Sequence, residues 1–129
     1  IERLRERVRQ HWASCQSLTS TQVRDRWRRY VRGWWQYYRL TGNPKPVVAQ
    51  DGWIRRHMRK RFWLRWHSSK GRLKALRKLG VPHPLLRCAK SGRGAWRMAR
   101  HPVMNKGLSN RTLKRYGFLC FADLLGKTA

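Results

Sequence analysis

The sequence predicts an all-α protein. Apolar residues recur at every third or fourth position along most of the chain, as they do on one face of a helix. The sequence lacks the alternation of apolar and polar residues that is typical of strands, and short stretches with Gly or Pro separate the periodic segments. We therefore expect a three-helix bundle followed by a smaller region of short helices, with a boundary near residue 68.

The first helix is expected over residues 1 to about 12. Leu4, Val8 and Trp12 follow one another at steps of four, which gives this segment a narrow apolar face. The chain opens inside the helical pattern and without an initiator Met, so we expect its N-terminus to be a cut through a longer protein. Residues 13–20 then indicate a loop.

A second helix is predicted from the capping-box spacing of Thr19 and Gln22. It should end near residues 41–44, where a glycine and a proline stand. Gly33 inside this helix costs about 1 kcal/mol relative to Ala, and we expect it to mark the close approach of a neighbouring helix or, as the less favoured alternative, of a nucleic-acid backbone. The apolar face of the second helix should carry Trp27, Val31, Trp34 and Tyr38.

A long third helix is expected over residues 47–67, because apolar residues stand at every fourth position from Ile54 to Trp66. Beyond a break at residues 68–71 the helices should be short. The expected pieces are a leucine-bearing helix stopped by Gly80, residues 85–90, a stretch around Trp96, a turn at residues 101–102, residues 109–116 closed by Gly117, and a last helix over residues 118–125.

The composition points to a polyanionic partner. The chain has 129 residues with 32 Lys and Arg against 5 Asp and Glu, which gives a formal net charge of +27. Phosphate is the obvious complement to so much positive charge. Residues 52–122 contain no carboxylate, which argues against an ordinary solvated basic face. Eight Trp, four Tyr and three Phe argue against a disordered chain.

The residue types that carry out catalysis are not grouped in this sequence. A polymerase needs carboxylates to hold its metal ions, and a hydrolase needs paired acids or an activated nucleophile. Asp25, Asp51 and Asp123 stand singly, the His residues lack the H-E-x-x-H spacing, and the three Cys are far apart. We expect no catalytic residue, metal, cofactor or disulfide framework in this chain, and no segment has the length of a membrane span.

Basic side chains interleaved with aromatic ones are the candidate binding residues. On a helix whose apolar face packs inward, basic residues lie along the other faces and contact phosphate and sugar, which fix position without reading sequence. We expect the Trp and Tyr residues to be core residues rather than platforms for stacked bases. The candidates for RNA or DNA binding are Arg24, Arg28, Arg29, Arg32, Arg55, Arg56, Arg59, Lys60, Arg93, Arg97, Lys114 and Arg115.

Residues 30–39 read Tyr-Val-Arg-Gly-Trp-Trp-Gln-Tyr-Tyr-Arg. This string resembles the L-R-G-W-x-N-Y-F pattern of the group II intron maturase domain, with Gln36 in place of the usual Asn. Further blocks resemble the family in its own order: residues 51–56, Trp63 and Trp66, residues 76–81, residues 91–97, and residues 108–110 with Tyr116 and Gly117. The structural residues of the motifs would be Gly33, Trp34, Tyr37, Tyr38, Trp53, Gly80, Trp96 and Gly117.

The resemblance implies two functional regions. Residues 1–67 would form the maturase-specific helices, which are a thumb-like bundle that binds intron RNA for splicing and helps to hold template and primer. Residues 68–129 would form a DNA-binding region that contacts target DNA during intron mobility. The end of the chain at residues 127–129, without an H-N-H nuclease module, implies a type that lacks the endonuclease.

The resemblance also implies a parent protein. An upstream finger-palm domain would make that protein a reverse transcriptase, an RNA-directed DNA polymerase that uses Mg²⁺, while this fragment is non-catalytic and needs no cofactor. The implied location is the bacterial cytoplasm near the nucleoid, with an organelle as the alternative. The main rival function is a structural RNA-binding component of a ribonucleoprotein, such as a ribosomal protein. A nuclease and a membrane-active cationic protein are weaker rivals, because the carboxylates are scattered and Gly and Pro interrupt the helices.

Overall fold

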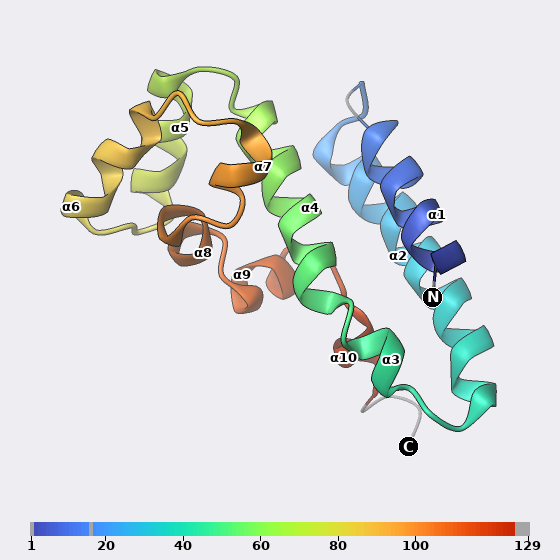
Figure 1. Cartoon of the computed structure of the whole chain (residues 1–129). Coiled ribbons are helices and arrows are strands. Elements are labelled where there is room, and N and C mark those ends of the chain that lie inside the picture. The colour runs from blue at the N-terminus through green and yellow to red at the C-terminus, as the bar shows by residue number, and fades with distance from the viewer. Residues whose placement is uncertain (1, 16, 126–129) are drawn as a thin grey trace. The chain divides into compact units, whose positions relative to one another are not determined.

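The computed structural model describes residues 2–15 and 17–125. Within these residues every regular element is a helix, so the predicted all-α class is confirmed (Figure 1). The predictions drawn from Ile1 and from residues 127–129 lie outside the described residues.

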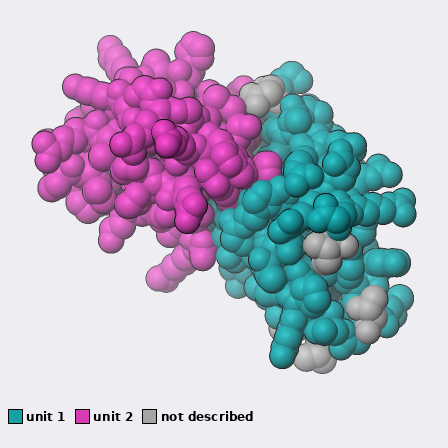
Figure 2. Space-filling view, viewed as in Figure 1, with its two compact units in different colours: residues 1–55, 113–129 teal, residues 56–112 magenta. Residues whose placement is uncertain are grey.

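The chain divides into two compact units. Unit 1 contains residues 1–55 and 113–129, and unit 2 contains residues 56–112 (Figure 2). This division differs from the boundary expected near residue 68, because the end of the chain returns to the unit of the N-terminal helices. The two functional regions, residues 1–67 and 68–129, stay a prediction.

Helix α1 (Glu2–Ala13) and helix α2 (Ser20–Tyr38) form where the sequence predicts them. The Thr19 hydroxyl accepts a hydrogen bond from the backbone N–H of Gln22, and the Gln22 side chain accepts one from the backbone N–H of Thr19. This reciprocal capping satisfies two N–H groups that a helix start leaves without partners. A 3₁₀ turn (Arg39–Thr41) continues α2, and the chain then turns at Gly42 with φ of +79°.

The buried face of α2 differs from the predicted one. It carries residues at strict steps of four: Val23, Trp27, Val31 and Trp35. Trp34 and Tyr38, which were expected on that face, are only half-buried. Both Trp34 and Trp35 fit the helical period after Val31, and the packing of Trp35 against Phe121, with ring centroids 6.4 Å apart, decides between them.

The predicted third helix is two helices, so the expected single element over residues 47–67 is wrong. A short helix α3 (Lys45–Val48) is followed by a turn and then by α4 (Asp51–Arg65). Pro46 fits the first turn of α3, where no intrahelical N–H is needed. Asp51 favours a new N-terminus because its negative charge lies in the first turn of α4, and Gly52 disfavours a continuous helix.

The C-terminal segment of unit 1, residues 118–124, completes the core of that unit. The Trp27 indole N–H donates to the Leu119 carbonyl oxygen at 2.6 Å. The Asp51 carboxylate accepts hydrogen bonds from the backbone N–H groups of Phe121 at 3.0 Å and Ala122 at 2.9 Å. Helix α10 (Phe121–Leu125) therefore starts three residues later than expected, because its first N–H groups bond to Asp51.

The helices of unit 2 are short, as predicted, with one addition. The expected elements are α5 (Ser69–Lys78), α6 (His83–Leu86) with a 3₁₀ turn (Arg87–Lys90), α7 (Ala95–Met98) and α9 (Asn110–Arg115), of which the last runs on into unit 1. Gly80 and Gly117 have φ of +85° and +92°, which agrees with their predicted capping role.

The sequence indicated only a turn where helix α8 (Pro102–Gly107) begins. His101 caps this helix through Nδ1, which accepts from the Val103 N–H, and Pro102 fits its first turn. Gly107 lies against Leu76 and Val81, so a Cβ there would come within 2.8 Å of the Leu76 side chain.

Arginine side chains in unit 2 bond to backbone carbonyls, because residues 56–112 contain no carboxylate. The Nε atoms of Arg56, Arg59 and Arg72 donate to the carbonyl oxygens of Trp96, Leu108 and Trp63. The Arg56 guanidinium also lies 4.0 Å from the Trp96 ring centroid, and that of Arg72 lies 4.3 Å from the Trp63 ring centroid. Carbonyl dipoles and aromatic faces thus take the place of acidic partners.

Candidate nucleic-acid interface

The five carboxylates of the chain are all engaged within unit 1. Four form ion pairs and the fifth is buried: Glu2 with Arg5 at 3.9 Å, Glu6 with Arg9 at 3.6 Å, Asp25 with Arg24 at 3.1 Å, Asp123 with Lys114 at 3.8 Å, and the buried Asp51. Burial raises the pKa of Asp51, while its hydrogen bonds from Ala122 and Phe121 act in the opposite direction. The remaining positive charge of the chain is uncompensated.

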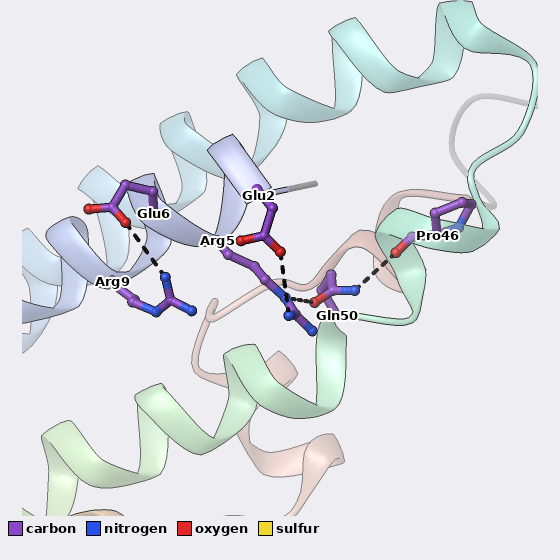
Figure 3. Close-up of polar contacts among 6 residues, drawn as sticks. All are labelled: Glu2, Arg5, Glu6, Arg9, Pro46 and Gln50. Carbon is purple, nitrogen blue, oxygen red and sulfur yellow. Dashed lines mark hydrogen bonds and ion pairs between the residues drawn. The ribbon is translucent and has the colours of Figure 1, made fainter.

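Figure 3 shows how two of the pairs lie along α1. Besides its contact with Glu2, Arg5 donates from Nε to the Gln50 side-chain oxygen at 2.7 Å, and the Gln50 amide nitrogen donates to the Pro46 carbonyl oxygen at 3.3 Å. These polar contacts join α1 to α3 and to the turn before α4. Arg5 therefore links elements of unit 1, whereas Arg9 pairs with Glu6 of its own helix and keeps 51% of its side chain exposed.

The predicted candidates on α2 fall into two groups. Arg29 and Arg32 are exposed, whereas Arg24 and Arg28 are half-buried. Arg24 pairs with Asp25 and its side chain lies against Gly117, where a Cβ would come within 2.6 Å. Of the candidates on this helix, Arg29 and Arg32 are thus the accessible ones; Arg26, which was not a candidate, is exposed as well.

The candidates on α4 are mostly engaged with their own unit. Arg59 is 7% exposed, and its Nη2 donates to the Asn110 side-chain oxygen at 2.8 Å in addition to its bond with Leu108. We therefore assign Arg59 a structural role. Arg56 bonds to Trp96, and its pKa is lowered by burial and by the nearby Arg100. Half-buried Lys60 lies 5.9 Å from the Trp96 ring centroid.

The remaining candidates lie in both units. Arg93 and Arg97 of unit 2 are exposed. In unit 1, Lys114 pairs with Asp123 but keeps 62% of its side chain exposed, and the Arg115 guanidinium lies 5.6 Å from the Tyr116 ring centroid. Arg55, also in unit 1, is half-buried and favours the charged form of Asp51.

The predicted motif residues have different surroundings. Trp53 and Trp96 each lie under arginine side chains, Arg5 and Arg9 over the first and Arg56 over the second. The expected helix contact at Gly33 is wrong, because a Cβ there would meet no heavy atom within 4 Å, so no helix packs on it in the described residues. The alternative, the approach of a nucleic-acid backbone, stays a prediction. Gly33 is part of an open groove.

This groove, called the aromatic groove below, lies on unit 1 and has a volume of about 640 Å³. Its lining residues come from α1 and α2: Arg3, Arg29, Tyr30, Gly33, Trp34, Tyr37 and Tyr38. We expected the aromatic members in the core, and Arg3 was not among the candidates. Arg3 precedes the apolar residue Leu4, but only the packing of α1 on α2 brings its side chain to the groove.

A second groove, of about 520 Å³, lies on unit 2. It is lined by Leu73, Arg77, His83, Pro84, Leu86, Arg87 and Lys90, none of which was a candidate. Arg77, Arg87 and Lys90 are exposed, and they add positive charge to a unit without carboxylates.

The side chains that hold metal ions are dispersed in this fold. Among residues 2–15 and 17–125, no group of three or more His, Cys, Asp and Glu side chains is placed to hold a metal ion. None of the described helices combines the length and the apolar character of a membrane span.

The fold and the site define a strongly basic, all-helical module whose carboxylates are all engaged internally. Residues 1–80 match the family model described as group II intron, maturase-specific domain. The chain belongs to this family, whose domain is the non-catalytic maturase part and acts in group II intron splicing. The match ends at Gly80, the C-terminal cap of α5. No curated protein matches the chain.

Proposed function

We propose that the chain binds group II intron RNA through its exposed arginines and lysines and thereby supports splicing. Family membership and the distribution of charge together support this proposal. A net charge of +27 with every carboxylate paired or buried leaves a surface that phosphate neutralises. The net charge carries the proposal, because only 5 Asp and Glu stand against 32 Lys and Arg.

The RNA contacts belong to residues that the fold leaves accessible. On α2 they include Arg29 and Arg32, and Arg3 of α1 lines the aromatic groove together with Arg29. Such side chains contact phosphate and sugar and set the position of the RNA. Arg59 is left out because its guanidinium is buried within unit 2.

The region after residue 80 contacts template-primer or target DNA in this proposal. It contains exposed Arg93, Arg97 and Arg100, and it lies beyond the residues that match the family model. The complete protein would then be a reverse transcriptase whose Mg²⁺-dependent palm lies upstream. The reading frame before Ile1 tests this part: a Tyr-x-Asp-Asp polymerase block supports it, and an initiator Met directly before Ile1 contradicts it.

Variants in which Gln replaces a single Arg, and which therefore remove one positive charge, test the RNA contacts. Arg32→Gln removes an exposed charge, whereas the matched variant Arg9→Gln removes a charge that is already paired with Glu6. Because each phosphate contact releases counterions, Arg32→Gln should weaken intron RNA binding and reduce its salt slope by about 1. Arg9→Gln should change both much less. Equal effects of the two variants would contradict the assignment of Arg32.

A further inference from the structure

We infer that the aromatic groove takes the base of an unpaired nucleotide, with Arg3 and Arg29 at its phosphates. This inference rests on the proposed RNA-binding function and names the part of the RNA that the groove selects. Three observations on the described residues support it. They are the exposed ring of Tyr37, the open space at the Cβ position of Gly33, and the lack of acidic partners for Arg3 and Arg29.

The aromatic surface of the groove is open. Trp34 and Tyr38 lie nearly parallel, with ring centroids 5.6 Å apart and an interplanar angle of 21°. Tyr37 stands at 90° to Trp34 and at 84° to Tyr38, and it is 63% exposed. An aromatic side chain so exposed has surface left for a further flat ring, and every nucleobase presents such a face.

Gly33 provides the space for that ring. It lies inside α2 with helical geometry and is exposed, and no heavy atom lies within 4 Å of the position that a Cβ would occupy. Neither backbone conformation nor packing within the described residues therefore requires a glycine here, although glycine weakens a helix. The open position leaves room for the close approach of a molecule from outside the described residues.

The arginines of the groove favour an anionic ligand, and its aromatic side chains favour one with a flat ring. Its lining contains Arg3 and Arg29 and no carboxylate, and neither arginine has an ion pair within residues 2–15 and 17–125. A volume of about 640 Å³ lies within the range of roughly 300–1,000 Å³ that is usual for ligand pockets. Because bases inside a duplex are stacked on each other, the occupant is an unpaired nucleotide of a loop, bulge or single strand.

The test compares two probes that differ only in their bases. One is a short, labelled oligouridylate, and the other has the same number of phosphates but abasic riboses at its central positions. Binding of each to the full chain is measured by fluorescence anisotropy at low ionic strength. The wild-type chain should prefer the base-bearing probe by roughly fivefold or more, since each stacked base contributes about 1–3 kcal/mol.

Two variants assign this preference to the groove. Tyr37→Leu removes an exposed ring, and Gly33→Ala places a methyl group in the groove without removing any ring. Both should lose most of the preference and keep the affinity for the abasic probe. The matched control is Tyr116→Leu, which removes another exposed tyrosine ring of unit 1 outside the groove and should keep the preference. Circular dichroism melting confirms that each variant is folded.

The possible results distinguish a failure of the groove inference from a failure of the proposed RNA-binding function. Equal wild-type binding of both probes, with a steep dependence on salt, overturns the groove inference and leaves the proposed RNA-binding function standing. Full preference in both Tyr37→Leu and Gly33→Ala overturns the inference in the same way, and indicates that another segment or a protein partner covers the groove. Failure of the folded wild-type chain to bind either probe overturns both proposals.

Discussion

Arg59 shows how unit 2 holds a buried positive charge. Its guanidinium is held by the Leu108 carbonyl oxygen and the Asn110 side-chain oxygen, both at 2.8 Å. A buried cation is tolerated only where its N–H groups are bonded in this way. The same side chain that composition marks as a binding residue is therefore part of the core.

Replacing Arg59 by Ala should destabilise the chain by about 2–4 kcal/mol, because the buried Leu108 carbonyl oxygen and the part-buried Asn110 side chain lose their donor and a cavity forms. Arg59→Lys should recover only part of this loss, since an ammonium group cannot reproduce the planar fork of donors. Chemical denaturation measures both effects. Arg32→Ala is the exposed control, and an equal loss for Arg32→Ala and Arg59→Ala would contradict the structural role of Arg59.

His11 makes the stability of unit 1 depend on pH. Burial, followed by the charge of Arg26, lowers its pKa from 6.5 to about 4, and its ring lies against Trp12, Trp27 and Tyr30. The unfolded chain binds a proton at His11 between these two pKa values and the folded chain does not. Stability from this group is therefore fully present above pH 6.5 and is lost as the pH falls toward 4.

The loss from His11 should amount to about 3 kcal/mol across that range. Thermal melting between these pH values measures it. His11→Phe keeps a ring in the aromatic cluster but cannot take up a proton, so its melting temperature should vary less with pH than that of the wild type. Identical pH profiles for the two proteins would show that His11 is not the titrating group.

Two helical glycines have different surroundings, because Gly33 lies in an open groove and Gly107 packs against side chains. Gly33→Ala should stabilise the chain by roughly 0.5–1 kcal/mol, because helix propensity improves and the methyl group meets nothing in the described residues. Gly107→Ala should instead destabilise it, because its Cβ would lie 2.8 Å from Leu76 and 3.1 Å from Val81. Melting temperatures that move in opposite directions would support this distinction, and a destabilised Gly33→Ala variant would contradict it.

Among the elements of unit 1, residues 118–124 decide whether the N-terminal helices can fold alone. They accept the Trp27 indole hydrogen bond, donate two N–H groups to Asp51 and bring Phe121 against Trp35. A fragment of residues 1–67 would leave the Trp27 indole and the Asp51 carboxylate without these partners. The packing of unit 1 thus depends on residues distant in sequence.

A fragment of residues 1–67 should therefore lack cooperative unfolding, whereas the full chain should unfold with a clear transition. Circular dichroism and tryptophan fluorescence during thermal melting provide the measurement. Within the full chain, Asp51→Ala should lower the melting temperature more than Asp51→Asn, since Asn keeps one acceptor oxygen for the N–H groups of Phe121 and Ala122. A cooperative fragment would contradict the role assigned to residues 118–124.

Elements with local signals were predictable from the sequence. The Thr19 capping box, the spacing of Leu4, Val8 and Trp12, and the glycine cap at Gly80 each lie within a few residues of the element that they define. The late start of α10 and the choice of Trp35 over Trp34 as a core residue were not predictable. Both depend on contacts with residues 118–124, which no local pattern contains. The division of the third helix has local causes at Pro46, Asp51 and Gly52, which the apolar spacing alone does not include.

The sequence predicted a nucleic-acid-binding site, but it did not predict which residues of that site are accessible. Arginine-rich helices with aromatic residues indicated nucleic-acid binding, and family membership agrees with a role in intron splicing. Which arginines are accessible was not predictable, because burial of Arg59 and exposure of Arg32 come from tertiary packing. The aromatic groove was missed for the same reason, since Arg3 and Tyr37 meet only when α1 packs on α2.

Across the molecule as a whole, uncompensated charge should affect both the stability of the free chain and the proposed binding of RNA. The free chain, with a net charge of +27, repels itself at low ionic strength. Added salt should therefore raise the melting temperature of the free chain, because it screens this repulsion. A melting temperature that does not rise with salt would show that self-repulsion contributes little to the folding free energy.

Added salt should weaken the complex with RNA. A salt titration of that complex is the sharpest test of the proposed partner. The affinity of the folded chain for group II intron RNA is measured across a range of monovalent salt. If about 6–10 phosphates are neutralised, the affinity should fall by several orders of magnitude between roughly 50 and 200 mM salt. An affinity that barely changes over this range, or a folded chain that ignores the RNA at low salt, would contradict the claim that phosphate is the partner of this basic surface.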